Sequence, residues 1–341
     1  MGMTVSFCVI AYNEAEALPQ LLGDLAAQDY PKKQIEVILV DGDSTDRTKA
    51  VMKEFEETHK ESYSRIVVAD NKKRKLAPGW NVALKLVRGD IILKVDAHAR
   101  IPEDFVRRNV ELQEEGEYIT GGPRPCMPSK DTPWQRTLLL AEESMFGSGI
   151  ADFRRKSERK YVKSMFHAAY RREVFEKAGE FNEDLGRTED NEMHYRMSRL
   201  GYRFCYDPSI QSYQYIRGSL GKMMKQKAGN GYWVVLTTKV CPQCLSIYHF
   251  VPLAFVSSII GTTVLARFGR KLPAKLLWSA YGLGAAAMSA AAVHKKEKHI
   301  SQLALPFLFL LLHVSYGAGS LAGVVRLPFW KAGEKRGRRS K

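Results

Sequence analysis

Asp96 and His98 are the two residues of this chain whose types and spacing point most directly to chemistry. They follow an apolar run from Asp90 to Val95, which is typical of a buried strand. A carboxylate and an imidazole one residue apart could hold a divalent cation, and such a cation could bind a diphosphate. An ordinary Asx turn with a solvated histidine has the same spacing. The triplet alone therefore leaves both interpretations open.

Two earlier strands also end in polar side chains. The run Val5–Ile10 is followed by Tyr12 and Glu14, and the run 35–40 is followed by Asp41. In an open α/β sheet, ligands bind beyond the carboxyl ends of the strands. Asp41 could accept a hydrogen bond from a base or a ribose, and Tyr12 could stack on the base. Acidic residues at strand ends are also common turn formers, but three such ends on one edge favour a nucleotide site.

The elements that must position these side chains alternate between strand and helix over about the first 240 residues. Further strands are predicted at 65–68 and 90–95, and helices follow the first two strands. This order predicts βαβ units and a largely parallel sheet, so the fold class is α/β. The chain contains neither a GxGxxG sequence nor a P-loop lysine motif, so neither a dinucleotide site nor a kinase-type site is supported.

Several segments in this order resemble family 2 glycosyltransferases, which have the GT-A fold. The matching segments are Val9-Ile10-Ala11-Tyr12-Asn13-Glu14, Val40-Asp41-Gly42-Asp43-Ser44-Thr45-Asp46, Asn81 before Arg88-Gly89-Asp90, Asp96-Ala97-His98, Gly121-Gly122, Ala168-Ala169-Tyr170-Arg171-Arg172-Glu173 and Thr188-Glu189-Asp190-Asn191-Glu192. The Asp-Ala-His variant and the apolar C-terminal region are most similar to succinoglycan-type exopolysaccharide glycosyltransferases.

The resemblance implies a nucleotide-sugar donor, usually UDP-linked, and Mn²⁺ or Mg²⁺ as cofactor. It places Asp41 at the base, Asp96 near the ribose and the metal, and Ala11, Tyr12 and Glu14 around the nucleoside. His98 stands where the family has a second aspartate, which shifts preference toward Mn²⁺ and leaves room for weaker metal dependence. Asp41-Gly42-Asp43 also departs from the usual Asp-Asp-Gly, but the base-contacting Asp41 of the resemblance is retained.

Two adjacent acidic residues lie at the start of a helix predicted to begin within residues 186–190. Glu189 and Asp190 could face a pocket, or they could be ordinary first-turn acids that complement the helix dipole. The resemblance makes Asp190 the catalytic base, with Glu189 and Asn81 in supporting positions. The expected reaction is one in-line displacement that inverts the anomeric carbon, and no nucleophilic residue is assigned.

The C-terminal third is strongly apolar, and the chain carries a formal charge of +15. Three stretches, 247–266, 276–293 and 303–325, approach the length of a membrane span. Because no nucleic-acid motif is present, we expect phosphate and membrane partners and no nucleic acid. The predicted domains are a catalytic domain (1–240), a membrane region (241–330) and a basic tail (331–341). Gln226 and Trp233 lack the spacing of a processive-synthase motif, which argues against a polymerase.

These features predict a cell-membrane enzyme with a cytoplasmic catalytic domain and a cytoplasmic basic tail. Both ends on one side require an even number of spans, so one of the three stretches should lie flat or re-enter. The expected acceptor is a lipid-linked saccharide. Alternatives are direct glycosylation of polyprenyl phosphate and a catalytically silent nucleotide-sugar-binding protein. The five cysteines are scattered and odd in number, so no disulfide framework is expected.

Overall fold

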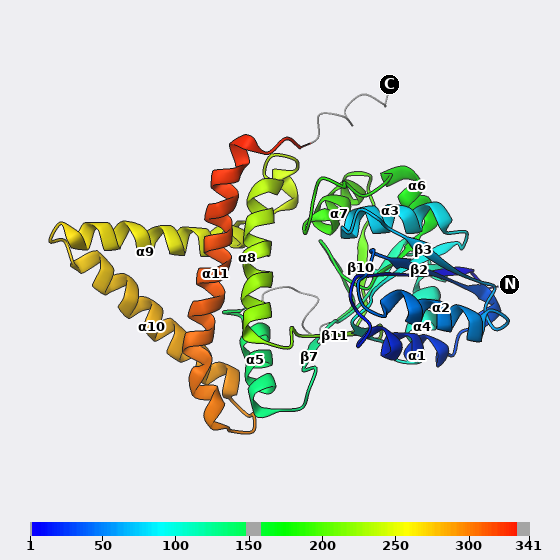
Figure 1. Cartoon of the computed structure of the whole chain (residues 1–341), viewed down its shortest axis with the longest axis horizontal. Coiled ribbons are helices and arrows are strands. Elements are labelled where there is room, and N and C mark those ends of the chain that lie inside the picture. Colours follow the sequence, from blue (N-terminus) through cyan, green and yellow to red (C-terminus); the bar gives the residue numbers. More distant parts are fainter. Residues whose placement is uncertain (1, 148–157, 333–341) are drawn as a thin grey trace. The chain divides into compact units, whose positions relative to one another are not determined.

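The structure is a computed structural model that describes residues 2–147 and 158–332 (Figure 1). Packing divides the chain into two units, each built from two stretches of sequence. The first, which we call the sheet unit, contains the chain up to Pro125 and a later stretch that ends at Gln214. The second, the helical unit, contains the segment from Cys126 and everything from Tyr215 onward. Each unit is described by itself.

The sheet unit contains an eight-stranded sheet in the order β3-β2-β1-β4-β9-β6-β10-β8. Its strands are β1 (Val5–Ala11), β2 (Ile35–Asp41), β3 (Arg65–Asp70), β4 (Ile91–Asp96), β6 (Ile119–Gly121), β8 (Lys160–Val162), β9 (Ala169–Arg171) and β10 (Phe204–Tyr206). The β1, β2, β3 and β4 strands are mutually parallel, and β9 is antiparallel to both of its neighbours. The predicted α/β, mostly parallel sheet is therefore confirmed.

The strand register places the predicted polar ends side by side. Ala11 pairs with Asp41, and Ile10 pairs with Asp96. All seven residues of β1 and all seven of β2 are buried, which explains why both read as apolar runs without a polar alternation. The carboxyl ends of β1, β2 and β4 thus form one edge from which short loops carry functional groups.

Helices cover both faces of the sheet (Figure 1). They are α1 (Leu18–Ala26), α2 (Thr48–His59), α3 (Leu76–Leu86), α4 (Phe105–Glu114), α6 (Arg172–Ala178) and α7 (Glu189–Arg199). Apolar residues of α1, α2 and α4 pack with Phe7 and Val9 of β1, whereas those of α3, α6 and α7 pack with Cys8 and Ile10. Alternate residues of one strand therefore belong to two separate cores.

A short strand pair adds one more element to the sheet unit. β11 (Tyr213–Tyr215) pairs antiparallel with β5 (Ala99–Arg100), which follows directly after β4. The register sets Gln214 opposite Ala99. Gln214, which follows Ala99 by more than a hundred positions in the chain, therefore lies near the end of β4.

The helical unit consists of long helices with little sheet. Its main elements are β7 (Cys126–Met127), α5 (Pro133–Glu143), α8 (Leu220–Thr237), α9 (Val251–Arg267), α10 (Leu272–Val293) and α11 (Leu305–Arg326). Its core joins Leu138 of α5, Met223 of α8 and Leu308 of α11. Gly231 and Gly319 let α8 and α11 approach closely, because a Cβ at either position would collide with the backbone of the other helix.

Three helical segments are long and apolar enough to span a membrane: Ile247–Arg267, Leu272–Val293 and Ile300–Phe329. They coincide with the three predicted apolar stretches. The predicted domain boundary at residue 240 differs from the packing boundary, because the apolar faces of α5 and α8 pack with α11 and place both helices in the helical unit. Of the predicted basic tail, residues 333–341 lie outside the described residues.

Candidate active site

The loops that follow β1 and β2 are tied together by hydrogen bonds. The Asn13 side chain accepts from the backbone N–H of Thr45 at 2.8 Å, and the Asn13 N–H donates to Ser44 Oγ at 3.0 Å. Asn13 adopts a φ of 54°, a left-handed conformation that asparagine tolerates better than most residues. Tyr12 beside it keeps 46% of its surface exposed, so its ring is accessible to a ligand.

The Asp41-Gly42-Asp43 loop has a defined geometry. The Asp41 carboxylate is buried at the end of β2 and accepts from the Ser44 N–H at 3.2 Å. Gly42 donates to Ala11 O at 2.7 Å, and a Cβ at this glycine would lie only 3.1 Å from that oxygen. Asp43 turns away to Arg74, whose Nε lies 2.7 Å from Oδ2. The glycine in the middle position therefore permits close contact between the two loops.

Asp96 and His98 converge on one side chain. Gln214 Nε2 donates to Asp96 Oδ2 at 3.0 Å and lies 3.0 Å from His98 Nε2. The other ring nitrogen of His98, Nδ1, is 3.1 Å from Glu14 Oε1. Glu14, His98, Gln214 and Asp96 thus form a continuous polar chain that joins the end of β1 to the end of β4.

Further donors surround the Asp96 carboxylate. His167 Nε2 lies 3.3 Å from Asp96 Oδ2, and Arg124 donates to the side-chain oxygen Oε1 of Gln214. Burial opposes ionisation of Asp96, but the adjacent His167 ring and the charge of Lys94 outweigh it, so the pKa of Asp96 lies well below its usual range. Burial lowers the pKa of His167 to about 4, so this ring is neutral at neutral pH. Asp96 is therefore a carboxylate at any physiological pH.

The donor set at this point fits a small divalent cation only in part. Asp96 Oδ2 and His98 Nε2 converge on the Gln214 amide nitrogen, whereas the Gln214 amide oxygen accepts from Arg124. A carboxylate and an imidazole suit Mn²⁺ better than Mg²⁺. Glu14 would hold the far nitrogen of His98, the usual arrangement behind a metal-bound histidine. No cluster of three or more His, Cys, Asp or Glu able to hold a metal occurs among residues 2–147 and 158–332, so a cation at this point would need further ligands from a bound substrate.

Asp190 lies at the start of α7 and forms a buried ion pair with Lys94. Asp190 Oδ2 is 3.0 Å from Lys94 Nζ, and both side chains are more than nine-tenths buried. Lys94 precedes Asp96 by two residues on β4, so the two side chains project from the same face of the strand. Burial favours the neutral amine of Lys94, but the charges of Asp190 and Asp96 outweigh it and raise its pKa. Asp190 therefore faces the end of β4 that carries Asp96.

Two carboxylate oxygens near Lys94 are buried with no hydrogen-bond partner among the described residues. They are Asp190 Oδ1 and Glu189 Oε2. Burial, reinforced by the negative charge of Asp190, raises the pKa of Glu189 to about 7. Glu189 can therefore take up a proton near neutral pH, and Asp190 Oδ1 beside it is open to a hydrogen bond from a ligand.

Asn81 has a different environment from the other predicted site residues. Its amide donates to Phe181 O and Glu183 Oε1, both at 3.0 Å, and its carbonyl accepts from the Phe181 N–H at 2.7 Å. These bonds fix the segment between α6 and α7. Asn81 thus holds the backbone of the segment that leads to α7.

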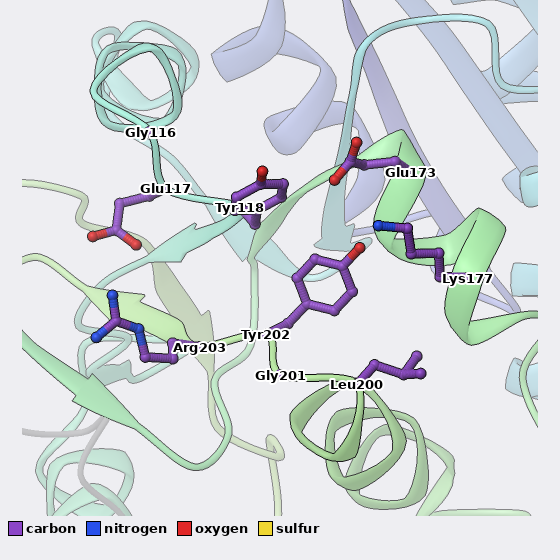
Figure 2. Close-up of a pocket in the computed structure, with 9 residues that line it drawn as sticks. All are labelled: Gly116, Glu117, Tyr118, Glu173, Lys177, Leu200, Gly201, Tyr202 and Arg203. Carbon is purple, nitrogen blue, oxygen red and sulfur yellow. The ribbon is translucent and has the colours of Figure 1, made fainter.

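A cavity of about 300 Å³ lies at the edge of the sheet opposite to the predicted site residues (Figure 2). Its lining residues are Gly116, Glu117, Tyr118, Glu173, Lys177, Leu200, Gly201, Tyr202 and Arg203. Tyr118 and Arg203 directly precede β6 and β10, so the cavity borders the amino ends of those strands. The predicted site residues come from the carboxyl ends of β1, β2 and β4 and from the start of α7, so the cavity is not part of this site.

Four residues of the site were missed by sequence reasoning: Lys94, Arg124, His167 and Gln214. A lysine inside an otherwise apolar buried strand is a detectable signal, because an isolated charge is costly to bury. No comparable signal marks Gln214, which reaches Asp96 through the pairing of β11 with β5.

Comparisons with known proteins agree with this architecture. Residues 6–179 match the family model for glycosyl transferase family 2. A Methanococcus voltae dolichyl N-acetyl-alpha-D-glucosaminyl phosphate 3-beta-D-2,3-diacetamido-2,3-dideoxy-beta-D-glucuronosyltransferase is 23% identical over 94% of this chain and 97% of its own length. The succinoglycan biosynthesis protein ExoA of Rhizobium meliloti (strain 1021) is 27% identical over 67% of this chain and 68% of its own.

Solved structures show the same fold at low identity. The mannosyltransferase PcManGT from Pyrobaculum calidifontis, in complex with GDP-Man and Mn²⁺, aligns with a TM-score of 0.56 at 22% identity, covering 96% of this chain and 88% of that one. S. aureus TarS in complex with UDP-GlcNAc aligns with a TM-score of 0.51 at 19% identity, covering 94% and 91%. The predicted GT-A fold and the predicted resemblance are confirmed: the chain belongs to glycosyl transferase family 2.

Proposed function

We propose that this protein is a membrane-anchored inverting glycosyltransferase that moves one sugar from a nucleotide-sugar, most simply a UDP-sugar, to a lipid-linked saccharide. The observation that carries the proposal is the buried Lys94–Asp190 pair. Through it, a carboxylate from α7 faces the strand end that bears Asp96 and His98. A candidate base and a candidate diphosphate site therefore share one edge of the sheet.

The donor would be held by the ends of β1, β2 and β4. Asp41 accepts from the base, Tyr12 flanks it, and Ala11 and Glu14 complete the nucleoside pocket. Asp96 and His98 would hold Mn²⁺ or Mg²⁺. When bound, such a cation stabilises the negative charge on the departing diphosphate. Support comes from the convergence of Asp96 Oδ2 and His98 Nε2 on one point.

The proton would be taken up at Asp190. As the acceptor oxygen forms its bond to the anomeric carbon, its proton passes to Asp190 Oδ1, and the bond from that carbon to the diphosphate oxygen breaks on the opposite face. Lys94 holds Oδ2 and keeps Asp190 in place. A single displacement of this kind inverts the anomeric carbon and needs no covalent sugar–enzyme intermediate.

The acceptor is proposed from the relatives and from the apolar helices. The relative that spans nearly the same length is named for action on a dolichyl phosphate-linked sugar, and a second relative is named for succinoglycan biosynthesis. Three helical segments here are long and apolar enough to enter a bilayer, where a lipid carrier resides. A polyprenyl phosphate acceptor is the second candidate, because it uses the same donor site and the same membrane.

The proposal is tested with the full chain in detergent or native membranes. Nucleotide-sugars are first screened with Mn²⁺ for thermal stabilisation, since a ligand that binds the folded state raises its stability. Transfer is then measured to bare polyprenyl phosphate and to a diphosphate-linked saccharide. Transfer only to the saccharide supports the first candidate, and transfer to the bare phosphate supports the second. Stabilisation by a donor without any transfer would instead indicate a silent binding protein.

A further inference from the structure

The three apolar segments of the helical unit are not arranged as three parallel spans. Figure 1 shows α8 running alongside α11, whereas α9 leaves across α11. The two cross at Gly317, where a Cβ would collide with the backbone of Pro252 in α9. Membrane-spanning helices tilt only moderately from the bilayer normal. Two helices that lie across each other cannot both span, so either α9 or α11 must lie along the membrane surface.

The partner of α11 indicates that α11 is the helix at the surface. Gly319 packs on Ala228, and Gly323 packs on Tyr232, so α8 accompanies α11 in the same direction. Lys239 Nζ, just beyond the end of α8, donates to Trp330 O at 2.7 Å, just beyond the end of α11. At each point along α11, the neighbouring part of α8 therefore lies at the same depth in the membrane.

Charges on α8 would be carried into hydrocarbon if α11 crossed the bilayer. Lys222 and Lys225 lie in the first turns of α8, and Lys227 is paired with Glu142 of α5 at 2.9 Å. Charged groups at the bilayer centre are costly. At the membrane surface they cost little, and the exposed apolar face of α11, which includes Phe307, Leu311, Val314 and Val325, can enter the acyl boundary.

The α9–α10 hairpin differs from α11 because it does not pack against a charged helix along its length. Only Val256 in α9 and only Ala285 in α10 are fully buried by protein, and most other residues of these two helices are exposed. The 17 residues of α9 and the 22 of α10 measure about 25 and 33 Å, close to the thickness of a hydrocarbon core. Four cations cluster at the turn between them: Arg267, Arg270, Lys271 and Lys275. Four cations are stable in lipid headgroups or water but not in hydrocarbon. If the hairpin enters the bilayer, its turn must therefore reach the opposite membrane surface.

We propose that the protein has two membrane spans, α9 and α10, and that α11 lies with α8 and α5 in the membrane interface. This inference rests on the membrane anchoring in the proposed function. It satisfies the requirement for an even number of spans, and it puts the segments on either side of the hairpin on one membrane face. That face carries the larger positive charge, contributed by Lys222, Lys225, Lys239, Lys295, Lys296, Lys298, Arg326 and Lys331, so it is the cytoplasmic one.

The test is cysteine mapping of the full chain in sealed vesicles of both orientations. The five native cysteines are replaced, and single cysteines are introduced as Arg270→Cys at the hairpin turn, Lys296→Cys before α11 and Lys331→Cys after it. An impermeant maleimide is applied from each face. We expect Arg270→Cys to label at least tenfold faster from the outer face, and both lysine variants to label at least tenfold faster from the cytoplasmic face.

Other labelling patterns contradict the two-span arrangement in distinct ways. Opposite labelling of Lys296→Cys and Lys331→Cys would show that α11 spans. Cytoplasmic labelling of all three would show a re-entrant hairpin. Release of the protein from membranes by alkaline carbonate would overturn the anchoring on which the inference rests, and it would leave the donor and proton-transfer assignments untouched. A nitroxide at Phe307 and at Val325 adds a second readout, because equal shallow depths are expected for an interfacial α11.

Discussion

The two acidic centres of the site have opposite environments although Lys94 faces both. At the end of β4, Asp96 receives a hydrogen bond from Gln214 and lies beside His167, and its pKa is held well below the usual range. At the start of α7, Glu189 Oε2 has no partner among the described residues, and burial raises the pKa of this group to about 7. Environments that separate the pKa values of neighbouring acids assign them different tasks. The end of β4 is suited to binding, and the start of α7 to moving protons.

The largest expected effect comes from removing the base at the start of α7. Asp190→Asn should lower kcat by about 10²–10⁴-fold, because a positioned base contributes about that much, while the donor KM changes little. The measurement is initial transfer rate against donor concentration. The amide also removes the carboxylate that is paired directly with the buried Lys94, so the free energy of unfolding should fall. A Lys94→Met/Asp190→Asn double variant should recover stability without recovering activity. Near-normal kcat in Asp190→Asn would remove Asp190 as the base.

The next effect concerns stability as a function of pH. Glu189 has an ordinary pKa of 4.5 and a folded-state pKa of about 7, so its protonated form favours folding. That stability is present below the unfolded pKa and is lost as pH rises through about 7, by at most about 3 kcal/mol. Glu189→Gln should abolish this part of the loss, as measured by unfolding midpoints between pH 4.5 and pH 8. The exposed Glu176→Gln on α6 is the matched control. An unchanged pH dependence in Glu189→Gln would contradict the assignment.

A smaller effect is expected at the end of β4. Gln214→Ala removes the side chain that links Asp96 to His98, and loss of such a supporting group costs about 10–100-fold in metal affinity. Mn²⁺ binding is measured directly by titration without turnover. Gln211→Ala, three residues earlier, provides the control because its side chain contacts Tyr213 and not the site. Equal Mn²⁺ affinity in both variants would place any cation elsewhere.

The smallest effect sharpens the division between binding and proton transfer. Tyr12→Ala removes an exposed aromatic ring beside the base pocket, and an aromatic contact contributes about 0.5–1.5 kcal/mol. We expect the donor KM to rise about 2- to 12-fold, while kcat and its pH profile stay unchanged. Tyr12→Phe keeps the ring and should behave like the native protein. A change in the pH profile of Tyr12→Ala would show that the two centres are not independent.

The sequence was sufficient for the architecture, whereas the roles of the carboxylates stay predictions. Apolar runs that end in Tyr12, Asp41 and Asp96 predicted both the strands and the edge where they meet, because parallel strands place their carboxyl ends together. It could not supply the contacts made across distant segments. Gln214 reaches Asp96 only through the register of β11 on β5, and Asn81 clamps the loop before α7 through Phe181. These contacts depend on three-dimensional pairing that no local pattern encodes.

The order in which the chain visits its two units has a consequence for biosynthesis. Gln214 belongs to the sheet unit, yet it is translated only after the segment from Cys126 that belongs to the helical unit. The polar chain from Glu14 to Asp96 is therefore incomplete until α5 has emerged from the ribosome, and α8 follows within a few residues. A single proteolytic cut cannot separate the two units cleanly, since each is made of non-contiguous sequence. Completion of the site and synthesis of the first helices of the helical unit are thus expected to occur close together in time.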